Sequence, residues 1–455
     1  MPTTPDLITD AQASEERFLR QIFVRDQMAE WSKNPLLMAK ADGVYYWDNH
    51  GNRYLDALSG IYTVSVGHNN RRVIEAMKKQ LDTLHFSPPM HGTNPVAVQL
   101  ANMIADIAPG DLNTVKFESA GSEVTEAAIK IARQYHKLTG NPGKFKIISR
   151  YMSWHGSTMG SLSASGLKSR KTVNEPLAPG FIHVFPPTCY RCPFGKEYPS
   201  CEITCATLVN DVIEMEDAST VAAIMVEPIG HTGGIIDPPP EYLKILREVC
   251  DRHNILLIFD EIITGMGRTG QMFAAETFGV IPDVICTAKG LSGGYAPLSA
   301  MITRKPIADA FWGPIDKNPG FVEGHTFEGN PLSCAAGIAV LREILERDLC
   351  GNARKQGERL RAGFQKLADK YGIIGDIRGK GLLQGIEFVK DVKTKERFPA
   401  TPGIGVQIGK RALANGLLCR FDPHWLAFGP ALVTTSEQLD EMLDLLDRSM
   451  SEVVG

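Results

Sequence analysis

The chain has 455 residues, of which 43% are hydrophobic and 22% charged, and its formal net charge at pH 7 is −4. This composition is typical of a globular protein with more than one core, and the slightly acidic balance argues against a nucleic-acid-binding or polybasic membrane surface. The longest apolar runs, such as 221–226 and 255–259, are far shorter than the roughly 18 residues of a membrane span. The polar N-terminal segment has no signal-peptide pattern, so we expect a cytoplasmic protein.

Short apolar runs of the buried-strand type recur from about residue 115 onward and alternate with helical patterns. This alternation predicts a mostly parallel sheet with helices on both faces. Ligands of such sheets bind outside the carboxyl ends of the strands. The predicted helices are 122–138 and 241–253, and the predicted strands are 144–150, 181–185, 221–229, 255–261 and 284–289.

The two ends of the chain show a different pattern. Residues 45–60 have the alternation of a hairpin around Asn49–Gly51. The C-terminal region mixes predicted helices at 331–349, 404–415 and 436–450 with strands around 373–389, 417–421 and 425–430. We therefore predict an α/β fold with a large domain at 66–328 and a smaller α+β domain built from 1–65 and 329–455.

Two charged residues stand at the ends of apolar strands, where burial of a charge is costly. Asp260 follows the run 255–259, and Lys289 ends the run that begins at 284, before a glycine-rich turn. Alone, Asp260 is equally well explained as a cap or a structural ion pair, and Lys289 as a strand-end lysine that reaches water. Together they supply what pyridoxal 5′-phosphate (PLP) requires, which is an acid for its pyridine nitrogen and an amine that forms an imine.

A bound PLP also needs partners for its phosphate and its ring. Gly121 and Ser122 lead into a helix whose first N–H groups can bind an anion, although a serine there is also an ordinary helix cap. Thr326, in the loop before residue 331, is a second phosphate candidate, or else a turn residue. Trp154 could stack on the ring and Ile262 could pack on its other face, while core packing explains each of them as well.

The order of six short motifs resembles the class III aminotransferases, PLP enzymes of fold type I, over nearly the whole chain. The motifs are SAGSE, WHG, VEPI, FDEIITGMGRTG, AKG and GHTFEGNP. The resemblance implies that Lys289 binds the cofactor as an imine and moves the substrate proton, and that Asp260 pairs with the pyridinium nitrogen. Trp154 takes the place of the usual tyrosine. The implied cofactor-binding residues are Gly121, Ser122, Trp154, His155, Glu227, Asp260, Ile262, Lys289 and Thr326.

The resemblance also implies how subunits associate. Thr326 would bind the phosphate of the neighbouring subunit's cofactor, so we expect a homodimer with shared active sites, or a tetramer. We expect small-molecule substrates, and neither a nucleic acid nor a membrane as partner.

Departures from the family pattern indicate the branch. Ile263 stands where 2-oxoglutarate-dependent relatives usually have glutamine, and the run 427–430 lacks their arginine. Arg420 stands where amine:pyruvate transaminases keep an arginine for the substrate carboxylate. Tyr62 and Phe86 are candidate aromatic walls of the substrate pocket, or core residues.

The EPIGHTGG run also departs from the family pattern, and it places His231 near the site. His231 either shapes the choice of substrate or is a loop histidine without a function.

These features predict an ω-transaminase that moves an amino group from an amine or ω-amino acid to a keto acid, pyruvate in the first instance, by a ping-pong mechanism. Three alternatives stay open. The chain could be a 2-oxoglutarate-dependent class III aminotransferase. It could be an aminomutase, racemase or decarboxylase on the same fold. It could also be an inactive PLP-fold protein that binds zinc and a partner.

Four of the nine cysteines lie in the run CYRCPFGKEYPSCEITC, outside every cofactor motif. They could hold a structural zinc ion, form disulfides, which a reducing compartment disfavours, or remain reduced thiols. Their C-x2-C-x8-C-x3-C spacing is looser than that of paired zinc knuckles. We therefore expect this run to order a loop and not to carry the reaction. The four residues are Cys189, Cys192, Cys201 and Cys205.

Overall fold

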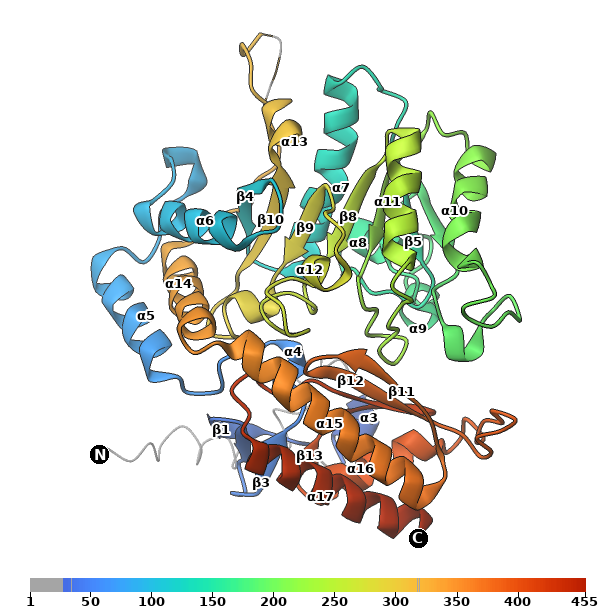
Figure 1. The fold of residues 1–455 in the computed structure, drawn as a ribbon. Helices are drawn as coiled ribbons and strands as arrows, with labels where there is room; N and C mark the ends of the chain where they lie inside the picture. Colours follow the sequence, from blue (N-terminus) through green and yellow to red (C-terminus); the bar gives the residue numbers. More distant parts are fainter. Residues whose placement is uncertain (1–27, 34, 317, 319) are drawn as a thin grey trace.

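The computed structural model describes residues 28–33, 35–316, 318 and 320–455. The N-terminal segment without a signal-peptide pattern, and with it the start of the predicted small-domain segment 1–65, lies outside these residues. The upper half of the molecule in Figure 1 is built on a seven-stranded sheet in the order β4-β10-β9-β8-β7-β5-β6. Its strands are β4 (Leu112–Glu118), β5 (Lys146–Arg150), β6 (Phe181–Val184), β7 (Val221–Val226), β8 (Leu256–Asp260), β9 (Val284–Thr287) and β10 (Ser299–Arg304).

The sheet is parallel from β6 to β9, and β10 runs antiparallel to both of its neighbours. Every residue of β7 and β8 is buried. Side chains alternate between two cores because successive residues of a strand point to opposite faces. Leu257 and Phe259 of β8 belong to one hydrophobic cluster, and Leu256 and Ile258 to the other. The predicted α/β architecture with helices on both faces is confirmed.

Helices supply the other half of each core. Helix α7 (Gly121–Leu138) buries Val124, Ala128 and Ile131 in one cluster. Helices α10 (Thr204–Met215) and α11 (Tyr242–His253) bury their apolar faces in the other. The sheet is thereby covered on both sides, and only the ends of its strands are left open for a ligand.

The lower half of the molecule in Figure 1 combines both ends of the chain. One four-stranded sheet joins β1 (Met38–Asp42), β2 (Tyr45–Asp48) and β3 (Arg53–Asp56) to β13 (Leu417–Leu418), which pairs parallel with β3. A second joins β11 (Ile374–Lys380), β12 (Leu383–Phe388), β15 (Trp425–Phe428) and β14 (Arg420–Asp422). The antiparallel pair β2–β3 is the hairpin that the sequence predicted. The domain limits near residues 65 and 328 stay predictions.

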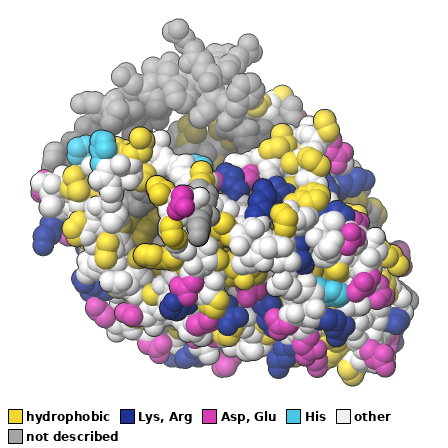
Figure 2. Space-filling model, turned by 90° about the horizontal axis from the view of Figure 1, so that it is seen from above, with side chains coloured by type: hydrophobic (Ala, Val, Ile, Leu, Met, Phe, Trp, Pro, Cys, Tyr) yellow, Lys and Arg dark blue, Asp and Glu magenta, His cyan; other side chains and the backbone are white. Residues whose placement is uncertain are grey.

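The C-terminal helices are α14 (Pro331–Glu346), α15 (Leu349–Tyr371), α16 (Ile404–Ala414) and α17 (Ser436–Val454). The remaining helices are α3 (Met28–Trp31), α4 (Ser59–Tyr62), α5 (Arg71–Thr83), α6 (Pro95–Ile107), α8 (Met159–Ala164), α9 (Lys168–Lys171), α12 (Ala274–Phe278), α13 (Lys305–Asp309), η1 (Pro89–His91), η2 (Cys189–Arg191) and η3 (Lys289–Leu291). No helix in the described part of the chain is long and apolar enough to cross a membrane. On the face shown in Figure 2, basic and acidic side chains are interspersed.

Candidate active site

A cavity of about 450 Å³ opens where the carboxyl ends of β8 and β9 meet the N-terminus of α7. This is the edge at which open α/β sheets bind their ligands. Its lining brings together residues that are far apart in the sequence. Eight predicted site residues belong to it: Gly121, Ser122, Trp154, His155, Glu227, Asp260, Ile262 and Lys289.

Asp260, the last residue of β8, is held by two groups. Its Oδ2 lies 2.8 Å from Nδ1 of the buried His155, and its Oδ1 accepts a hydrogen bond from the backbone N–H of Ile262 at 3.1 Å. The carboxylate is therefore fixed in orientation although it is only 3% exposed. Nε2 of His155 has no hydrogen-bond partner among the described residues.

Lys289 follows β9 and lines the cavity in η3. It is partly exposed to the cavity, and the protein packed around its amine still removes much of the surrounding water. Burial lowers the pKa of the Lys289 amine from its ordinary value to about 8, against the opposing effect of Asp260 and Glu227. A desolvated lysine of this kind has a large neutral fraction near physiological pH, which is the nucleophilic form.

The lowered pKa predicts how the rate of cofactor binding depends on pH. The neutral fraction of Lys289 rises as the pH approaches about 8 and is nearly complete one or two units above. An ordinary lysine, with a pKa near 10.4, is still mostly protonated at about pH 9. We expect the rate at which the apo-protein binds PLP, measured by stopped-flow absorbance, to level off above about pH 8. A rate that still climbs between about pH 9 and 10 contradicts this prediction.

The N-terminus of α7 offers an anion site beside these two residues. Glu123 Oε2 accepts the N–H groups of Ser119 and Ala120 at 2.9 and 3.2 Å, so those donors are already satisfied. The first N–H groups inside a helix have no partner within the helix, and here they face the cavity through Gly121 and Ser122. Ser122 Oγ accepts the N–H of Ser157 at 2.9 Å, which leaves its own proton free to donate to an anion.

Close packing of the loop after β5 completes this anion site. Gly156 has φ +148°, and a Cβ there would lie 2.7 Å from Ser122 Oγ and 2.9 Å from Ser122 Cα. Only glycine lets the backbone come this close. Trp154 and Ile262 contribute apolar walls to the same cavity. The residues present therefore fit PLP, with an acid for the ring nitrogen, an amine for the aldehyde, apolar walls and an anion site for the phosphate.

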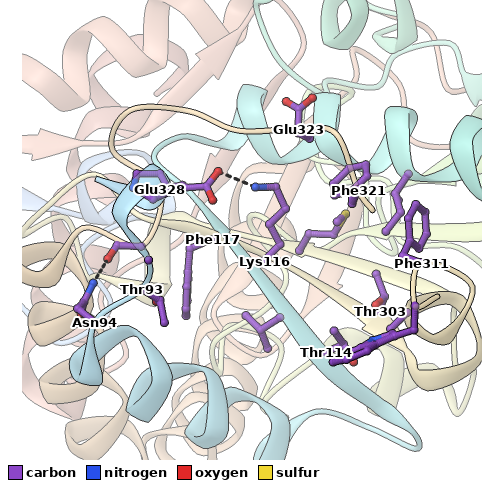
Figure 3. Close-up of a pocket in the computed structure, with 18 of the residues that line it drawn as sticks. Thr93, Asn94, Thr114, Lys116, Phe117, Thr303, Phe311, Phe321, Glu323 and Glu328 are labelled. Atoms are coloured by element: carbon purple, nitrogen blue, oxygen red, sulfur yellow. Dashed lines mark hydrogen bonds and ion pairs between the residues drawn. The ribbon is translucent and has the colours of Figure 1, made fainter. Parts of the chain in front are cut away.

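Two predicted site residues lie away from this cavity in their own chain. Thr326 is exposed in the loop between β10 and α14, and Phe86 is half-buried with its ring 5.6 Å from that of Phe327. Neither belongs to the lining of the Lys289 cavity. Two neighbours of these residues in the sequence, Ser87 and Glu328, line a second cavity of about 470 Å³, in which Lys116 Nζ donates to Glu328 Oε2 at 2.7 Å (Figure 3).

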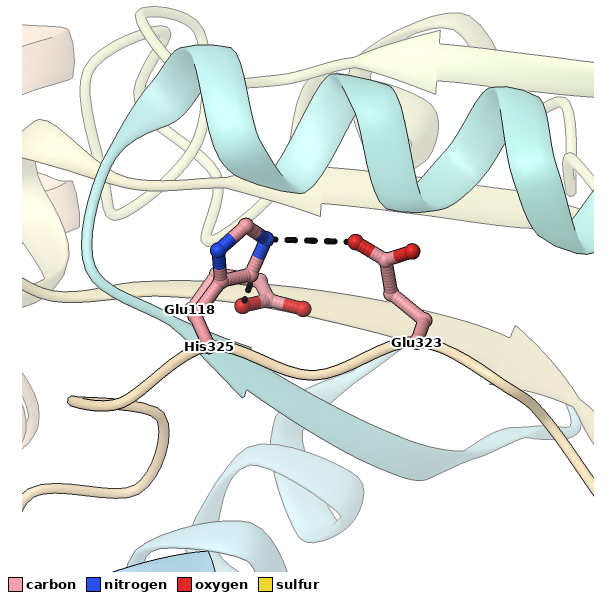
Figure 4. Close-up of side chains that lie close together, drawn as sticks. All are labelled: Glu118, Glu323 and His325. Atoms are coloured by element: carbon pink, nitrogen blue, oxygen red, sulfur yellow. Dashed lines mark hydrogen bonds and ion pairs between the residues drawn. The ribbon is translucent and has the colours of Figure 1, made fainter.

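The loop that carries Thr326 is tied to β4 by a cluster of charges (Figure 4). His325 Nε2 lies 3.1 Å from Glu323 and 3.7 Å from Glu118, and burial raises the pKa of Glu118 to about 7. The three side chains could hold a metal ion by their spacing alone. Lys116, 3.1 Å from Glu118, already supplies positive charge there, so we assign no metal to the cluster.

The four clustered cysteines line a small cavity of about 20 Å³, and all of them are free. In the described part of the chain, only Glu118, Glu323 and His325 bring three potential ligand atoms within 4.8 Å of one another. The four thiols are therefore not gathered as closely as a tetrahedral zinc centre requires. Zinc binding at this run stays a prediction.

Two further predicted site residues, Tyr62 and Arg420, are not part of the cavity lining. The ring of Tyr62 is buried and meets that of His231 edge-on at 5.7 Å. Burial raises the pKa of Tyr62 to about 12, an effect that Arg420 and Arg268 oppose. Arg420 also helps to lower the pKa of Lys289, so its guanidinium lies near the reactive amine. Its own side chain extends over the ring of Trp425 at 5.4 Å.

Sequence reasoning missed several residues of the lining. Thr63, Ser292 and Tyr295 also border the cavity. Tyr295 donates its hydroxyl proton to Gly67 O at 2.9 Å, which holds the N-terminal segment against the glycine-rich turn after Lys289. Thr63 reaches the site from a segment distant in sequence, whereas Ser292 and Tyr295 follow the AKG motif directly, so their nearness to Lys289 was the signal that could have found them.

Comparison with known proteins agrees with this geometry. The family model for class III aminotransferases matches residues 27–450. A probable aminotransferase of Mycobacterium tuberculosis is 40% identical over 416 residues, which cover 90% of this chain and 88% of that protein. An (S)-enantioselective ω-transaminase from Thermomicrobium roseum superimposes with a TM-score of 0.91 at 32% identity, over 100% of both chains.

A PLP-bound amine transaminase from an uncultivated Pseudomonas species superimposes with a TM-score of 0.90 at 34% identity, over 95% of this chain and 99% of that one. The family match spans nearly the whole chain, and the cavity holds the acid, the amine and the anion site that PLP needs. The chain belongs to the class III aminotransferases and is a PLP-dependent enzyme of fold type I.

Proposed function

We propose that the protein is an ω-transaminase that transfers an amino group from an amine or ω-amino acid to pyruvate. The observation that carries this proposal is that Arg420, although outside the cavity lining, lies close enough to Lys289 for its positive charge to help lower the pKa of that amine. A guanidinium there suits the carboxylate of a small keto acid. Ile263, and not the glutamine of the 2-oxoglutarate-dependent relatives, lines the same cavity.

The geometry of the cavity supports a role for each of these residues. Bound PLP supplies an electron sink for the electron pair that remains when a substrate carbon loses its proton. Asp260, oriented by His155, would keep the ring nitrogen protonated, and Gly121 and Ser122 would bind the phosphate. Lys289 first holds the cofactor. Its Nζ would also take the proton from the substrate carbon and return it at the neighbouring atom.

One site with one proton-transferring amine favours a ping-pong mechanism. The amine donor leaves as a carbonyl product before the keto acid enters, so both substrates use the same cavity in turn. Double-reciprocal plots of the rate should then be parallel lines when the donor concentration is varied at several pyruvate concentrations.

We also propose that two chains form a homodimer with shared active sites. Thr326 is exposed and Phe86 is half-buried, and both lie outside the lining of their own chain's Lys289 cavity. Large apolar side chains are exposed on the neighbouring segments, including Met90 at 94% and Trp312 at 82% exposure. Exposed apolar groups gathered in this way are typical of an association surface.

The nine free cysteines further support a reducing, cytoplasmic location.

The proposed reaction is tested by measuring alanine. Purified protein loaded with PLP is given a panel of amine donors with pyruvate or 2-oxoglutarate as acceptor. We expect alanine from pyruvate and faster turnover with pyruvate than with 2-oxoglutarate. Faster turnover with 2-oxoglutarate contradicts the choice of acceptor. Repeated turnover of an amino acid without any keto acid, beyond one equivalent per bound cofactor, contradicts transamination itself and favours a racemase or a decarboxylase.

The role of Arg420 predicts a selective loss. We expect Arg420→Ala to raise the KM for pyruvate about 10- to 100-fold, because one charge-assisted contact to the carboxylate is lost. The donor half-reaction with an amine that has no carboxylate should keep its rate, as followed by the absorbance of the bound cofactor. Arg411→Ala, at a half-exposed arginine on α16, is the matched control. Equal losses with both substrates contradict this role.

A further inference from the structure

The lining of the Lys289 cavity includes a glutamate and a histidine that contact each other. Glu227 follows β7, and His231 comes four residues later in a tight turn whose strands are joined by Gly230 N–H to Ile236 O at 3.0 Å. His231 Nδ1 lies 3.2 Å from Glu227 Oε1, and both residues are at most 5% exposed. Both residues line the cavity.

The charge of Glu227 fixes which nitrogen of His231 carries the proton. Hydrogen bonding to His231 and the nearby Arg150 keep the pKa of Glu227 below its ordinary value in spite of burial. Glu227 is therefore an ionised acceptor, and the Nδ1 of His231 must donate to it. Burial lowers the pKa of His231 to about 4, so the ring is neutral at physiological pH. A neutral imidazole that donates from Nδ1 has an unprotonated Nε2, which can only accept.

The ring of His231 is also held in place. Tyr62 packs edge-on against it with the ring centroids 5.7 Å apart, and Thr232, the next residue, donates to Met152 O at 2.5 Å. Arg420 and Lys289 lie close enough to act on the charge of His231. An acceptor fixed in this way at the wall of a substrate cavity discriminates strongly for groups that can donate to it, because an acceptor left unpaired there is costly.

We propose that His231 is a specificity-determining residue that accepts a hydrogen bond from a second donor group of the amine substrate. The favoured donors would be amines with a hydroxyl or a second amino group at the end away from the reacting nitrogen. Plain alkylamines of the same length would be poorer donors. This inference rests on the proposed transaminase activity, and it names a class of substrate for that activity.

The test compares matched donors with pyruvate as acceptor. Propylamine, butylamine and pentylamine are each compared with the amino alcohol and the diamine of the same chain length. The measured ratio is kcat/KM for the hydroxyl- or amino-bearing donor divided by kcat/KM for the plain alkylamine. In the wild type we expect a hydroxyl- or amino-bearing donor to exceed its plain counterpart. In His231→Phe, which keeps a ring beside Tyr62 and removes the acceptor, we expect this ratio to fall about tenfold. His253→Phe, at a histidine of α11 outside the cavity, is the control and should keep the wild-type ratio.

A ratio that does not change in His231→Phe overturns the inference, while alanine formation from butylamine still supports the transaminase. Absence of alanine with every donor instead overturns the proposed function. If His231→Phe fails to fold, the wild-type protein decides. Nitrogen-15 NMR of histidine-labelled holoenzyme should show a neutral His231 with the proton on Nδ1, and the Nε2 signal should shift with the terminal alcohol and not with the alkylamine. A proton on Nε2, or equal shifts with both amines, overturns the inference.

Discussion

Replacing Lys289 with alanine is expected to reduce the rate of amino transfer at least about 10⁴-fold, because one side chain both holds the cofactor and moves the substrate proton. The loss should appear in both half-reactions, since the same amine acts in each. It is measured as alanine formation from pyruvate and, separately, as the absorbance change of the bound cofactor on addition of a donor.

The stability of this variant separates a chemical loss from a folding defect. Lys289 is a desolvated amine, and its lowered pKa shows that its environment disfavours the charged form. Alanine removes that unfavourable charge, so the melting temperature of the apo-protein should stay the same or rise. Lys366→Ala, at an exposed lysine of α15, is the matched control and should retain full activity. Activity retained by Lys289→Ala contradicts the assigned role.

Asp260→Asn is expected to lower kcat/KM roughly 10²- to 10³-fold, because it removes a fixed negative charge and leaves the shape of the side chain nearly unchanged. The amide can still accept the Ile262 N–H through its oxygen. It can no longer hold a proton on the ring nitrogen of the cofactor. The absorbance spectrum of the loaded protein should shift accordingly, which reports the electronic effect independently of turnover.

The neighbouring Glu261 provides the control for Asp260. It is also buried, but it accepts the N–H groups of Ala274 and Ala275 at 2.6 and 2.9 Å and so caps α12, outside the cavity. Glu261→Gln should cost about 1–2 kcal/mol of stability and leave kcat/KM nearly unchanged. If Asp260→Asn and Glu261→Gln lowered activity equally, the loss at Asp260 would be structural and its role would be wrong.

The regions of the fold that could be predicted are those with a local pattern. The apolar runs that became β7 and β8 are buried on both faces, so they are recognised as strands without any knowledge of their neighbours. The residues Asp260 and Lys289 were found for the same reason. Each is a charged side chain at the end of such a run, and the parallel direction of β8 and β9 brings the two ends to one edge.

Elements whose pattern depends on distant packing were missed. Helix α15 contains Gly357 and Gly363, which look like breaks in a helix. A Cβ at Gly357 would lie 2.4 Å from Gly381 O, and one at Gly363 would lie 2.3 Å from Leu443. These glycines permit close contacts with β11–β12 and α17, and tertiary packing therefore overrides their low helix propensity.

The pairing of His155 with Asp260 was equally invisible, because the two residues are 105 positions apart. The WHG motif placed His155 near the cofactor, and only the folded loop after β5 shows that its contact is the carboxylate. The cysteine run is the opposite case, a conspicuous spacing that we expected to order a loop and not to carry the reaction. Its spacing attracts attention, while the thiols do not converge as ligands and line a cavity separate from that of Lys289.

The pairing of β13 with β3 has a consequence for synthesis of the protein. Leu417 and Leu418 form the last strand of a sheet whose other three strands end at Asp56. At a translation rate of about 5–20 residues per second, the partner strand follows roughly 20–70 seconds later. During this time the edge of β3 has no partner strand, and its free backbone N–H and C=O groups could pair with other chains. The seven-stranded sheet, which is complete at Arg304, can form during that delay, so this enzyme should build its cofactor-binding half before its N-terminal sheet is closed.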